Sequence, residues 1–165
     1  MSVNRGKKFE AVIRSAFEKV PNVSVDRLHD QTTGFRGSQN ICDFIVYRKP
    51  YEYYIECKSV HGNTLSIYSP DPKRKYGNIT NTQWEGLLEK SKIRGVYAGI
   101  ICWWIDKDVT RFLPIQYLDS FYEYGQKSVR YDFDMLFGRM IFPEIRGKKK
   151  RVFFDYNMEE FLDEI

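Results

Sequence analysis

The sequence has few of the residues that form zinc sites or disulfide frameworks. It contains three cysteines and two histidines among 165 residues, and none of them stands at the spacing typical of zinc ligands. We therefore expect Cys42, Cys57 and Cys102 to be buried free thiols, as in proteins of a reducing compartment. A structural zinc site and a disulfide-stabilised secreted domain are both disfavoured.

Long apolar segments are also missing. The longest apolar run, residues 96–105, is far shorter than the roughly 20 residues that a membrane-spanning helix needs. The first 17 residues are charged and amphipathic, without the apolar segment of a signal peptide. These features predict a protein of the bacterial cytoplasm, or of the host cytoplasm if a phage encodes it, with no membrane partner.

Aromatic and basic residues, by contrast, are plentiful. Aromatics make up 16% of the chain, and the formal net charge is +4 with an isoelectric point of about 8.9. Positive charge gathers in Arg5–Lys8, Lys73–Lys75 and Arg146–Arg151. Such runs suit contact with a polyanion such as DNA, although any single run is equally typical of a solvated surface.

Apolar periodicity predicts an α/β protein. We expect a helix over about residues 4–20, a polar stretch over 30–40, and a hairpin of strands at 41–47 and 51–59. A long loop over 61–81 then leads to a helix that begins near Thr82, where Thr82 and Glu85 fit a capping box. Further expected elements are strands at 96–105 and 109–115 and short helices at 116–124 and 158–165. This order predicts a mixed central β-sheet flanked by helices.

Three charged residues interrupt the two strands of the predicted hairpin. Side chains alternate faces along a strand, so Glu56 and Lys58 project to one side while Ile55 and Cys57 project to the other. Hairpin pairing can bring Asp43 beside Glu56. Two adjacent carboxylates repel each other, and a hard divalent cation with oxygen ligands relieves that repulsion. The pattern favours metal-assisted hydrolysis of a phosphodiester, with Lys58 near the phosphate.

Other interpretations of these residues are open. Glu56 and Lys58 could form a cross-strand ion pair on an exposed edge, worth roughly 0–1 kcal/mol. Glu10 lies at the margin of the first apolar helix face, where its carboxylate can lean toward Asp43 or serve as an ordinary boundary residue. Gln83 is in the first turn of the second helix and, taken alone, is a plain surface glutamine.

The ordered motifs resemble the PD-(D/E)xK nuclease superfamily, and within it the RecU-type and phage-encoded Holliday junction resolvases. The motifs span about residues 4–115 and read Gly6-Lys-Lys-Phe-Glu10, Arg36-Gly-Ser38-x4-Asp43, Tyr54-Ile-Glu56-Cys-Lys58-Ser59 and Thr82-Gln83. The resemblance implies a restriction-endonuclease-like core of αβββαβ order, within a single nuclease domain of residues 1–165 whose C-terminal extension is 116–165. RecU-type proteins carry a stalk before the motif aspartate. Here Asp43 follows Pro21 by only 22 positions, so such a stalk would be short or absent.

The resemblance also implies roles for individual residues. Asp43, Glu56 and the backbone carbonyl of Cys57 would bind Mg²⁺, which Mn²⁺ could replace. Glu10 would bind a metal-linked water or a second ion. Lys58 would orient the attacking water, and Gln83 would support Lys58 or the nucleophile. The implied DNA contacts are Arg5, Lys7, Lys8, Arg36, Ser38, Lys73, Arg74 and Lys75.

We thus expect a homodimeric, metal-dependent endonuclease that resolves four-way DNA junctions by paired nicking. The same motif would equally serve a restriction-like or repair nuclease acting on linear or flapped DNA, because the shared motif fixes the chemistry rather than the substrate. A non-catalytic DNA-binding module, whose aromatic residues stack on bases, is the alternative from another class.

Overall fold

The computed structural model describes residues 4–29, 40–67, 78–133, 135–136 and 139–165. Its centre is a five-stranded mixed sheet with strand order β1-β2-β3-β5-β6. These strands are β1 (Ser24–Arg27), β2 (Phe44–Arg48), β3 (Tyr51–Val60), β5 (Val96–Trp104) and β6 (Val109–Pro114). Only the β3–β5 pair is parallel, and the other three pairs are antiparallel. The predicted α/β class with a mixed central sheet is confirmed.

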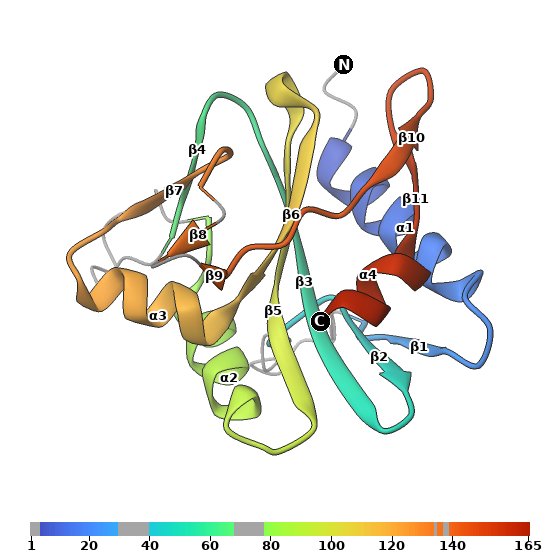
Figure 1. Ribbon diagram of the computed structural model, residues 1–165, viewed down its shortest axis with the longest axis horizontal. Coiled ribbons are helices and arrows are strands. Elements are labelled where there is room, and N and C mark those ends of the chain that lie inside the picture. The colour runs from blue at the N-terminus through green and yellow to red at the C-terminus, as the bar shows by residue number, and fades with distance from the viewer. Residues whose placement is uncertain (1–3, 30–39, 68–77, 134, 137–138) are drawn as a thin grey trace, which may run out of the picture.

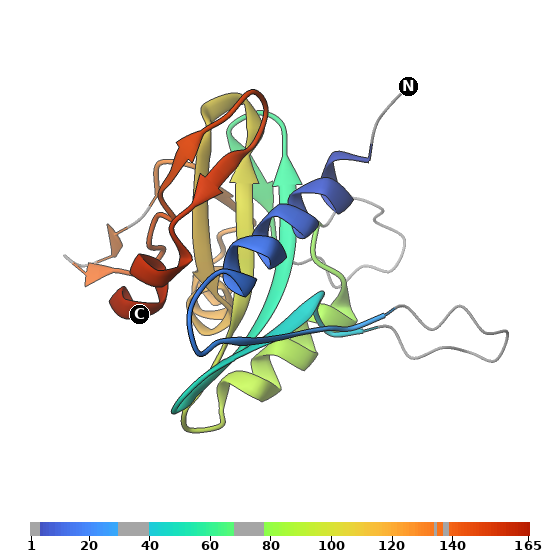
Figure 2. The same ribbon diagram turned by 90° about the vertical axis from the view of Figure 1, so that its right-hand side faces the viewer.

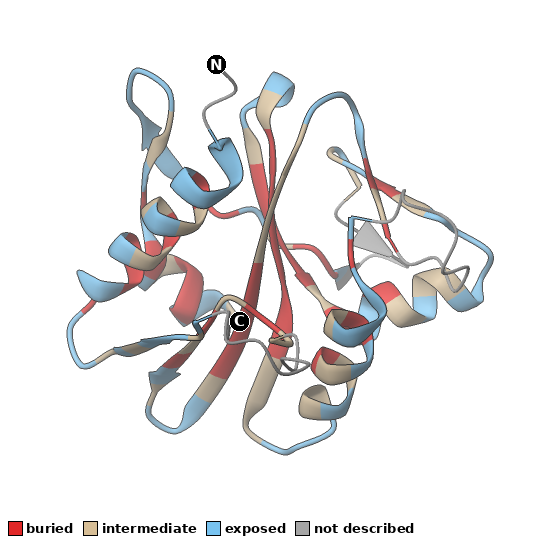
Figure 3. Cartoon of the chain, turned by 180° about the vertical axis from the view of Figure 1, so that it is seen from behind, coloured by how far each residue is buried: buried red, intermediate tan, exposed pale blue. Residues whose placement is uncertain are grey.

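Helices cover both faces of this sheet (Figures 1 and 2). The helices α1 (Arg5–Glu18) and α4 (Met158–Glu164) pack on one face, and α2 (Asn81–Ser91) and α3 (Ile115–Glu123) pack on the other. Burial is accordingly highest in the middle strands and on the inner sides of the helices (Figure 3). The order α1, β1–β3, α2, β5 matches the predicted αβββαβ order.

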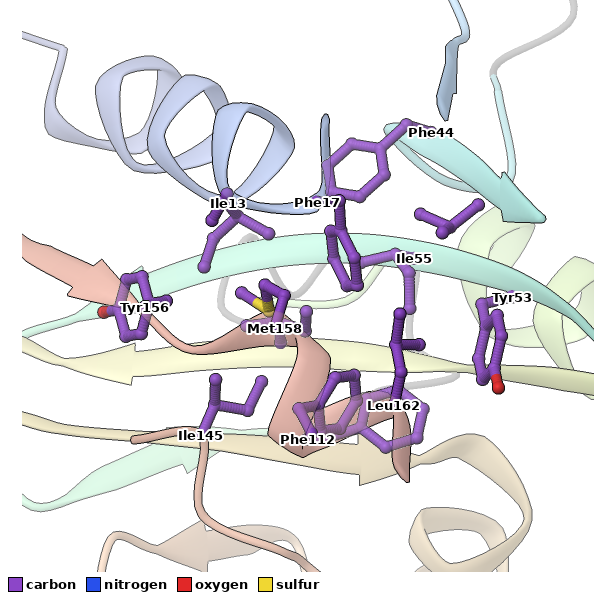
Figure 4. Close-up of a cluster of buried hydrophobic side chains, with 14 of the residues drawn as sticks. Ile13, Phe17, Phe44, Tyr53, Ile55, Phe112, Ile145, Tyr156, Met158 and Leu162 are labelled. Atoms are coloured by element: carbon purple, nitrogen blue, oxygen red, sulfur yellow. The ribbon is translucent and has the colours of Figure 1, made fainter. Parts of the chain in front are cut away.

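Apolar spacing explains how α1 is placed. Phe9, Ile13, Ala16 and Phe17 are buried at helical intervals, and the Asn4 side chain caps the helix by accepting a hydrogen bond from the backbone N–H of Lys7. The buried face meets the side of β3 that carries Ile55 (Figure 4). Residues 5–18 form the helix, so the predicted range of 4–20 is two residues too long at its C-terminal end.

The remaining strands are short and lie outside the central sheet. They pair as β4 (Thr64–Ser66) with β7 (Ser128–Arg130), β8 (Met135–Leu136) with β9 (Arg139–Met140), and β10 (Gly147–Lys149) with β11 (Phe154–Tyr156). A 3₁₀ turn, Ile105–Lys107, joins β5 to β6. We did not predict β1 or these three ribbons, and β4 lies inside the segment that we expected to be a loop. Their two to four residues are too few to show a two-residue period.

The C-terminal extension contributes to the same hydrophobic core as α1. Ile145, Tyr156, Met158 and Leu162 are buried in it (Figure 4), and so is Phe161. Residues 143–145 also follow the edge of β6: the N–H of Phe112 donates to the carbonyl of Pro143, and the N–H of Ile145 donates to the carbonyl of Thr110. The extension therefore packs directly on the central sheet.

No helix in the described part of the chain combines the length and the apolarity required to cross a bilayer.

If the chain is one domain, a core defect in the extension should destabilise the whole molecule. Phe161 is 2% exposed and its ring contacts those of Phe17 and Phe112. Phe161→Ala should lower the free energy of unfolding by about 3–5 kcal/mol in a single transition. Urea titrations followed by tryptophan fluorescence and circular dichroism measure this. Tyr124→Ala is the control, because Tyr124 is 79% exposed and its loss should cost under about 0.5 kcal/mol. Two separate transitions would contradict the single domain.

Candidate active site

Three elements bring the predicted catalytic residues together. Glu56 and Lys58 stand on β3, the middle strand of the sheet, and face the side on which α2 packs. Ile55 and Cys57 face α1, as the strand alternation predicted. Asp43 lies directly before β2 rather than within it, and Gln83 is in the first turn of α2.

Gln83 links the acid and the base of β3. Its Nε2 donates to Glu56 Oε1 at 2.6 Å, and its Oε1 accepts from Lys58 Nζ at 3.3 Å. Lys58 Nζ also lies 2.7 Å from Glu56 Oε1. The Glu56 residue is only 4% exposed, so this is no surface ion pair, and the alternative of a pair on a solvent-facing edge is excluded. Burying an ion pair is costly unless further hydrogen bonds satisfy its remaining lone pairs, and Gln83 supplies such a hydrogen bond.

The Asp43 carboxylate is held at the end of the β2–β3 ladder. The backbone N–H of Cys57 donates to Asp43 Oδ2 at 2.7 Å, and the N–H of Asp43 donates to the carbonyl of Ile55 at 3.0 Å. The ladder pairs Phe44 with Ile55, so the next position places Asp43 opposite Glu56. The hairpin therefore brings the two carboxylates together as predicted.

Burial disfavours the ionised forms of both acids, and repulsion by a neighbouring carboxylate adds to this effect. Burial first, and then the negative charge of Glu56, raises the pKa of Asp43 from 3.8 to about 7. Burial also raises the pKa of Glu56, although Lys58 and Gln83 oppose that shift. Two carboxyl groups that resist ionisation beside each other are typical of a site whose charge a bound cation would balance.

The oxygen donors present fit a magnesium ion. In the part of the chain that the structure describes, no group of three or more histidine, cysteine, aspartate or glutamate side chains could hold a metal by itself. Magnesium needs only one or two carboxylates when water and phosphate oxygens complete its shell. The N–H and C=O of one strand residue point to the same side of the strand. Because the Cys57 N–H donates to Asp43, the Cys57 carbonyl also points to the side where Asp43 lies and adds a third oxygen.

Glu10 lies close to this pair but has another partner. Its Oε1 accepts a hydrogen bond from Arg27 Nε at 2.9 Å, and its side chain is 14% exposed. Its charge still contributes to the raised pKa of Asp43 and of Glu56. Glu10 thus acts on Asp43 through its charge while its hydrogen bond goes to Arg27. Arg27 was missed, because it belongs to the short strand β1 that the sequence did not reveal.

The predicted capping box of α2 is wrong by two residues. The N-cap is Thr80, whose side chain accepts from the N–H of Gln83 at 3.2 Å while Gln83 Oε1 accepts from the N–H of Thr80 at 3.0 Å. Thr80 and Gln83 have the same three-residue spacing as Thr82 and Glu85, so the signal was present. The capping role also fixes the Gln83 side chain that contacts Glu56 and Lys58.

The thiols are neutral parts of this region rather than reactive groups. Burial raises the pKa of Cys42 to about 12, and burial also raises the pKa of Cys57 and of Cys102 well above the ordinary value. Cys42 and Cys102 are buried as predicted, while Cys57 is half-buried. Cys42 precedes β2, so it does not lie in a strand.

The predicted DNA contacts divide into two groups. Arg5, Lys7 and Lys8 are exposed in the first turn of α1, one turn before Glu10. Cations at a helix N-terminus are unfavourable for the helix dipole, which itself attracts anions. The other predicted contacts, Arg36, Ser38, Lys73, Arg74 and Lys75, lie outside the described residues.

A cavity of about 500 Å³ opens beside Lys58. Its lining residues are Lys58, Ser59, Val60, His61, Thr64, Ser66 and Asn78. His61 was not predicted to be near the site; its Nδ1 lies 3.0 Å from Asp106 Oδ1. The N–H of Gly62, which donates to Asp106 Oδ2 at 2.6 Å, is the main cause of the lowered pKa of Asp106. The sequence pattern around His61 did not predict its contact with Asp106, which lies 45 positions further along the chain.

Comparison with known proteins finds similarity to solved structures but not to protein families or curated sequences. No protein-family model matches the chain, and no curated protein matches it. Among solved structures it is similar to Hjc, a Holliday junction resolvase of the hyperthermophilic archaeon Archaeoglobus fulgidus. The sequences are 19% identical, the match covers 67% of this chain and 78% of that one, and the TM-score is 0.45. At this level the likeness adds no argument to those from the site itself.

The raised pKa of Asp43 makes a prediction for the metal-free protein. A carboxyl whose folded pKa lies above its unfolded value favours folding at low pH, and that contribution is lost as the pH rises from about 4 through about 7. Asp43→Asn keeps an oxygen that can accept from Cys57 N–H but carries no charge. The parent should lose stability between pH 5 and pH 8, whereas the variant lacks this titrating group. The unfolding free energy of the variant minus that of the parent should therefore be about 2 kcal/mol larger at pH 8 than at pH 5.

Urea denaturation in EDTA at the two pH values measures this difference. Glu123→Gln is the matched control, since Glu123 is exposed at the end of α3 and its substitution should have no pH-dependent effect of this size. An Asp43→Asn gain that stays the same at both pH values would show that Asp43 ionises normally in the folded protein.

Proposed function

We propose that this protein is a metal-dependent endonuclease that cuts four-way DNA junctions. The observation that carries the proposal is the convergence of Asp43, Glu56, Lys58 and Gln83 in one half-buried cluster. The cluster joins two acids that resist ionisation to a lysine and a glutamine from separate elements. Structural ion pairs rarely need two adjacent buried carboxylates, whereas phosphodiester hydrolysis with Mg²⁺ uses them.

Each residue of the cluster would have its own role in hydrolysis. Asp43, Glu56 and the Cys57 carbonyl would hold Mg²⁺, which when bound polarises the phosphate and lowers the pKa of a coordinated water. Lys58, which is held by Glu56 and Gln83, would donate to a phosphate oxygen and stabilise the negative charge that develops during attack. Gln83 would keep the Lys58 ammonium in place. Glu10 would accept from water at the edge of the site, with Arg27 fixing its carboxylate.

Exposed cations would bind the DNA backbone. Arg5, Lys7 and Lys8 stand on the same helix as Glu10, one turn closer to its N-terminus, and are exposed. Contacts of this kind bind phosphates without reading sequence, so affinity should fall steeply with salt.

The four-way junction as substrate rests on the motif resemblance and on the expectation of a homodimer with one active site per nicked strand. Linear duplex and flapped DNA are the rival substrates, because the chemistry would be the same. A direct comparison of cleavage rates distinguishes them.

Removal of the proposed metal ligand or the lysine should abolish cleavage but spare binding. In Mg²⁺ or Mn²⁺, Asp43→Asn and Lys58→Ala should each cut a labelled four-way junction at least about a hundredfold more slowly, since one stabilising group is lost from the transition state. Gel-shift affinity without metal should stay within about threefold, because neither group supplies the main phosphate contacts. Either variant cutting at the parent rate would refute the nuclease.

The substrate is tested on the parent protein. The junction should be nicked symmetrically at least about tenfold faster than a linear duplex of the same arm sequences, and EDTA should stop both reactions. Equal rates on the two substrates would overturn the junction specificity while leaving the nuclease chemistry intact.

A further inference from the structure

The β4–β7 ribbon presents a polar surface next to Lys58. Thr64 pairs with Arg130 and Ser66 pairs with Ser128, so these four side chains lie on one face of the ribbon. The alternate residues, Leu65 and Val129, are fully buried on the other face and anchor the ribbon to the core. Thr64 and Ser66 also line the cavity that contains Lys58.

A second cavity lies next to the first one. It measures about 510 Å³ and shares the lining residue Thr64 with the Lys58 cavity, so the two are neighbours along the ribbon. We call it the α3–β7 pocket, and its lining residues are Thr64, Phe121, Tyr124, Gln126, Ser128, Arg130 and Phe133. Figure 1 shows β4, β7 and α3 gathered on one side of the molecule.

The α3–β7 pocket has two aromatic walls, one packed against the core and the other exposed to solvent. The rings of Phe121 and Phe133 lie 4.8 Å apart and both contact Phe142, which is fully buried, so this wall is fixed. Tyr124, directly after α3, is 79% exposed and can close against a bound group. The pocket thus combines an exposed tyrosine with apolar rings, and exposed apolar patches of this kind occur in ligand-binding grooves.

Polar groups surround this aromatic space. Gln126, Ser128 and Thr64 offer donors and acceptors, and Arg130 adds a guanidinium that Asp132 holds in a two-bond pair. Flat aromatic walls with amide and hydroxyl groups at the rim suit a nucleobase, which stacks through its faces and forms hydrogen bonds at its edge. The polar ribbon face between this space and Lys58 suits the sugar-phosphate chain.

We propose that the α3–β7 pocket binds one unpaired base of the DNA strand whose phosphate lies at Lys58. This inference rests on the proposed function and extends it, because it assigns a preference for branched DNA with an unpaired nucleotide near the cut. It also gives the C-terminal extension, which supplies every lining residue except Thr64, a role in substrate binding.

Fluorescence of an unpaired 2-aminopurine tests the pocket. The base is placed in turn at each position flanking the cut in a four-way junction, and the protein carries Asp43→Asn so that it binds without cutting. One position should be quenched on binding, and adding Tyr124→Ala should remove the quenching. Tyr124→Ala should weaken binding to the junction with the unpaired base about five- to hundredfold, and weaken binding to fully paired duplex less than about twofold.

Two further variants serve as controls. Tyr124→Phe keeps the ring and should bind like the parent, and Tyr47→Ala removes a tyrosine that is 47% exposed on β2, away from the pocket, with no effect. Unchanged quenching and affinity in Tyr124→Ala would overturn the pocket while leaving the nuclease untouched. Failure of the protein to cut or bind any DNA would instead refute the proposed function, and the pocket with it.

Discussion

Burial of the Glu56 carboxylate on the middle strand of the sheet is the constraint around which the candidate site is arranged. At 4% exposure this group has lost most of its contact with water, and such a loss costs several kcal/mol unless partners replace it. Lys58 and Gln83 supply those partners from β3 and α2. Asp43 then adds a second carboxylate, whose own ionisation burial and the charge of Glu56 oppose, so the metal-free site is held at the expense of stability.

The rest of the fold fixes these groups in place. The parallel β3–β5 pair keeps Glu56 and Lys58 in the middle of the sheet, and the antiparallel β2–β3 ladder sets Asp43 against the Cys57 N–H. The capping box of α2 fixes Gln83 through Thr80. A side chain that both caps a helix and bridges an ion pair has little freedom, which is the preorganisation that electrostatic catalysis requires.

Sequence patterns predicted the features that repeat over many residues. The helix of Phe9, Ile13 and Phe17, the apolar strand at 96–105 and the hairpin that joins Asp43 to Glu56 are all confirmed. The contact of Gln83 with Lys58 was found only through the family resemblance, because a single glutamine has no local pattern. Arg27 and His61 were missed, since each depends on tertiary contacts of short elements such as β1 and β4. Thr80 was missed although its capping box with Gln83 is a local pattern, because the box was placed two residues too late. The α3–β7 pocket, built from residues far apart in the chain, had no signal in the sequence.

Asp43 and Glu56 are proposed to share a divalent cation. Anomalous diffraction from crystals soaked in Mn²⁺ tests it most directly. We expect an anomalous peak within about 2.0–2.6 Å of a carboxylate oxygen of each residue and of the Cys57 carbonyl, and we expect this peak to be lost in Asp43→Asn. Mn²⁺ bound only elsewhere, with Glu56 still paired to Lys58 and the protein cutting DNA in the same solution, would contradict it.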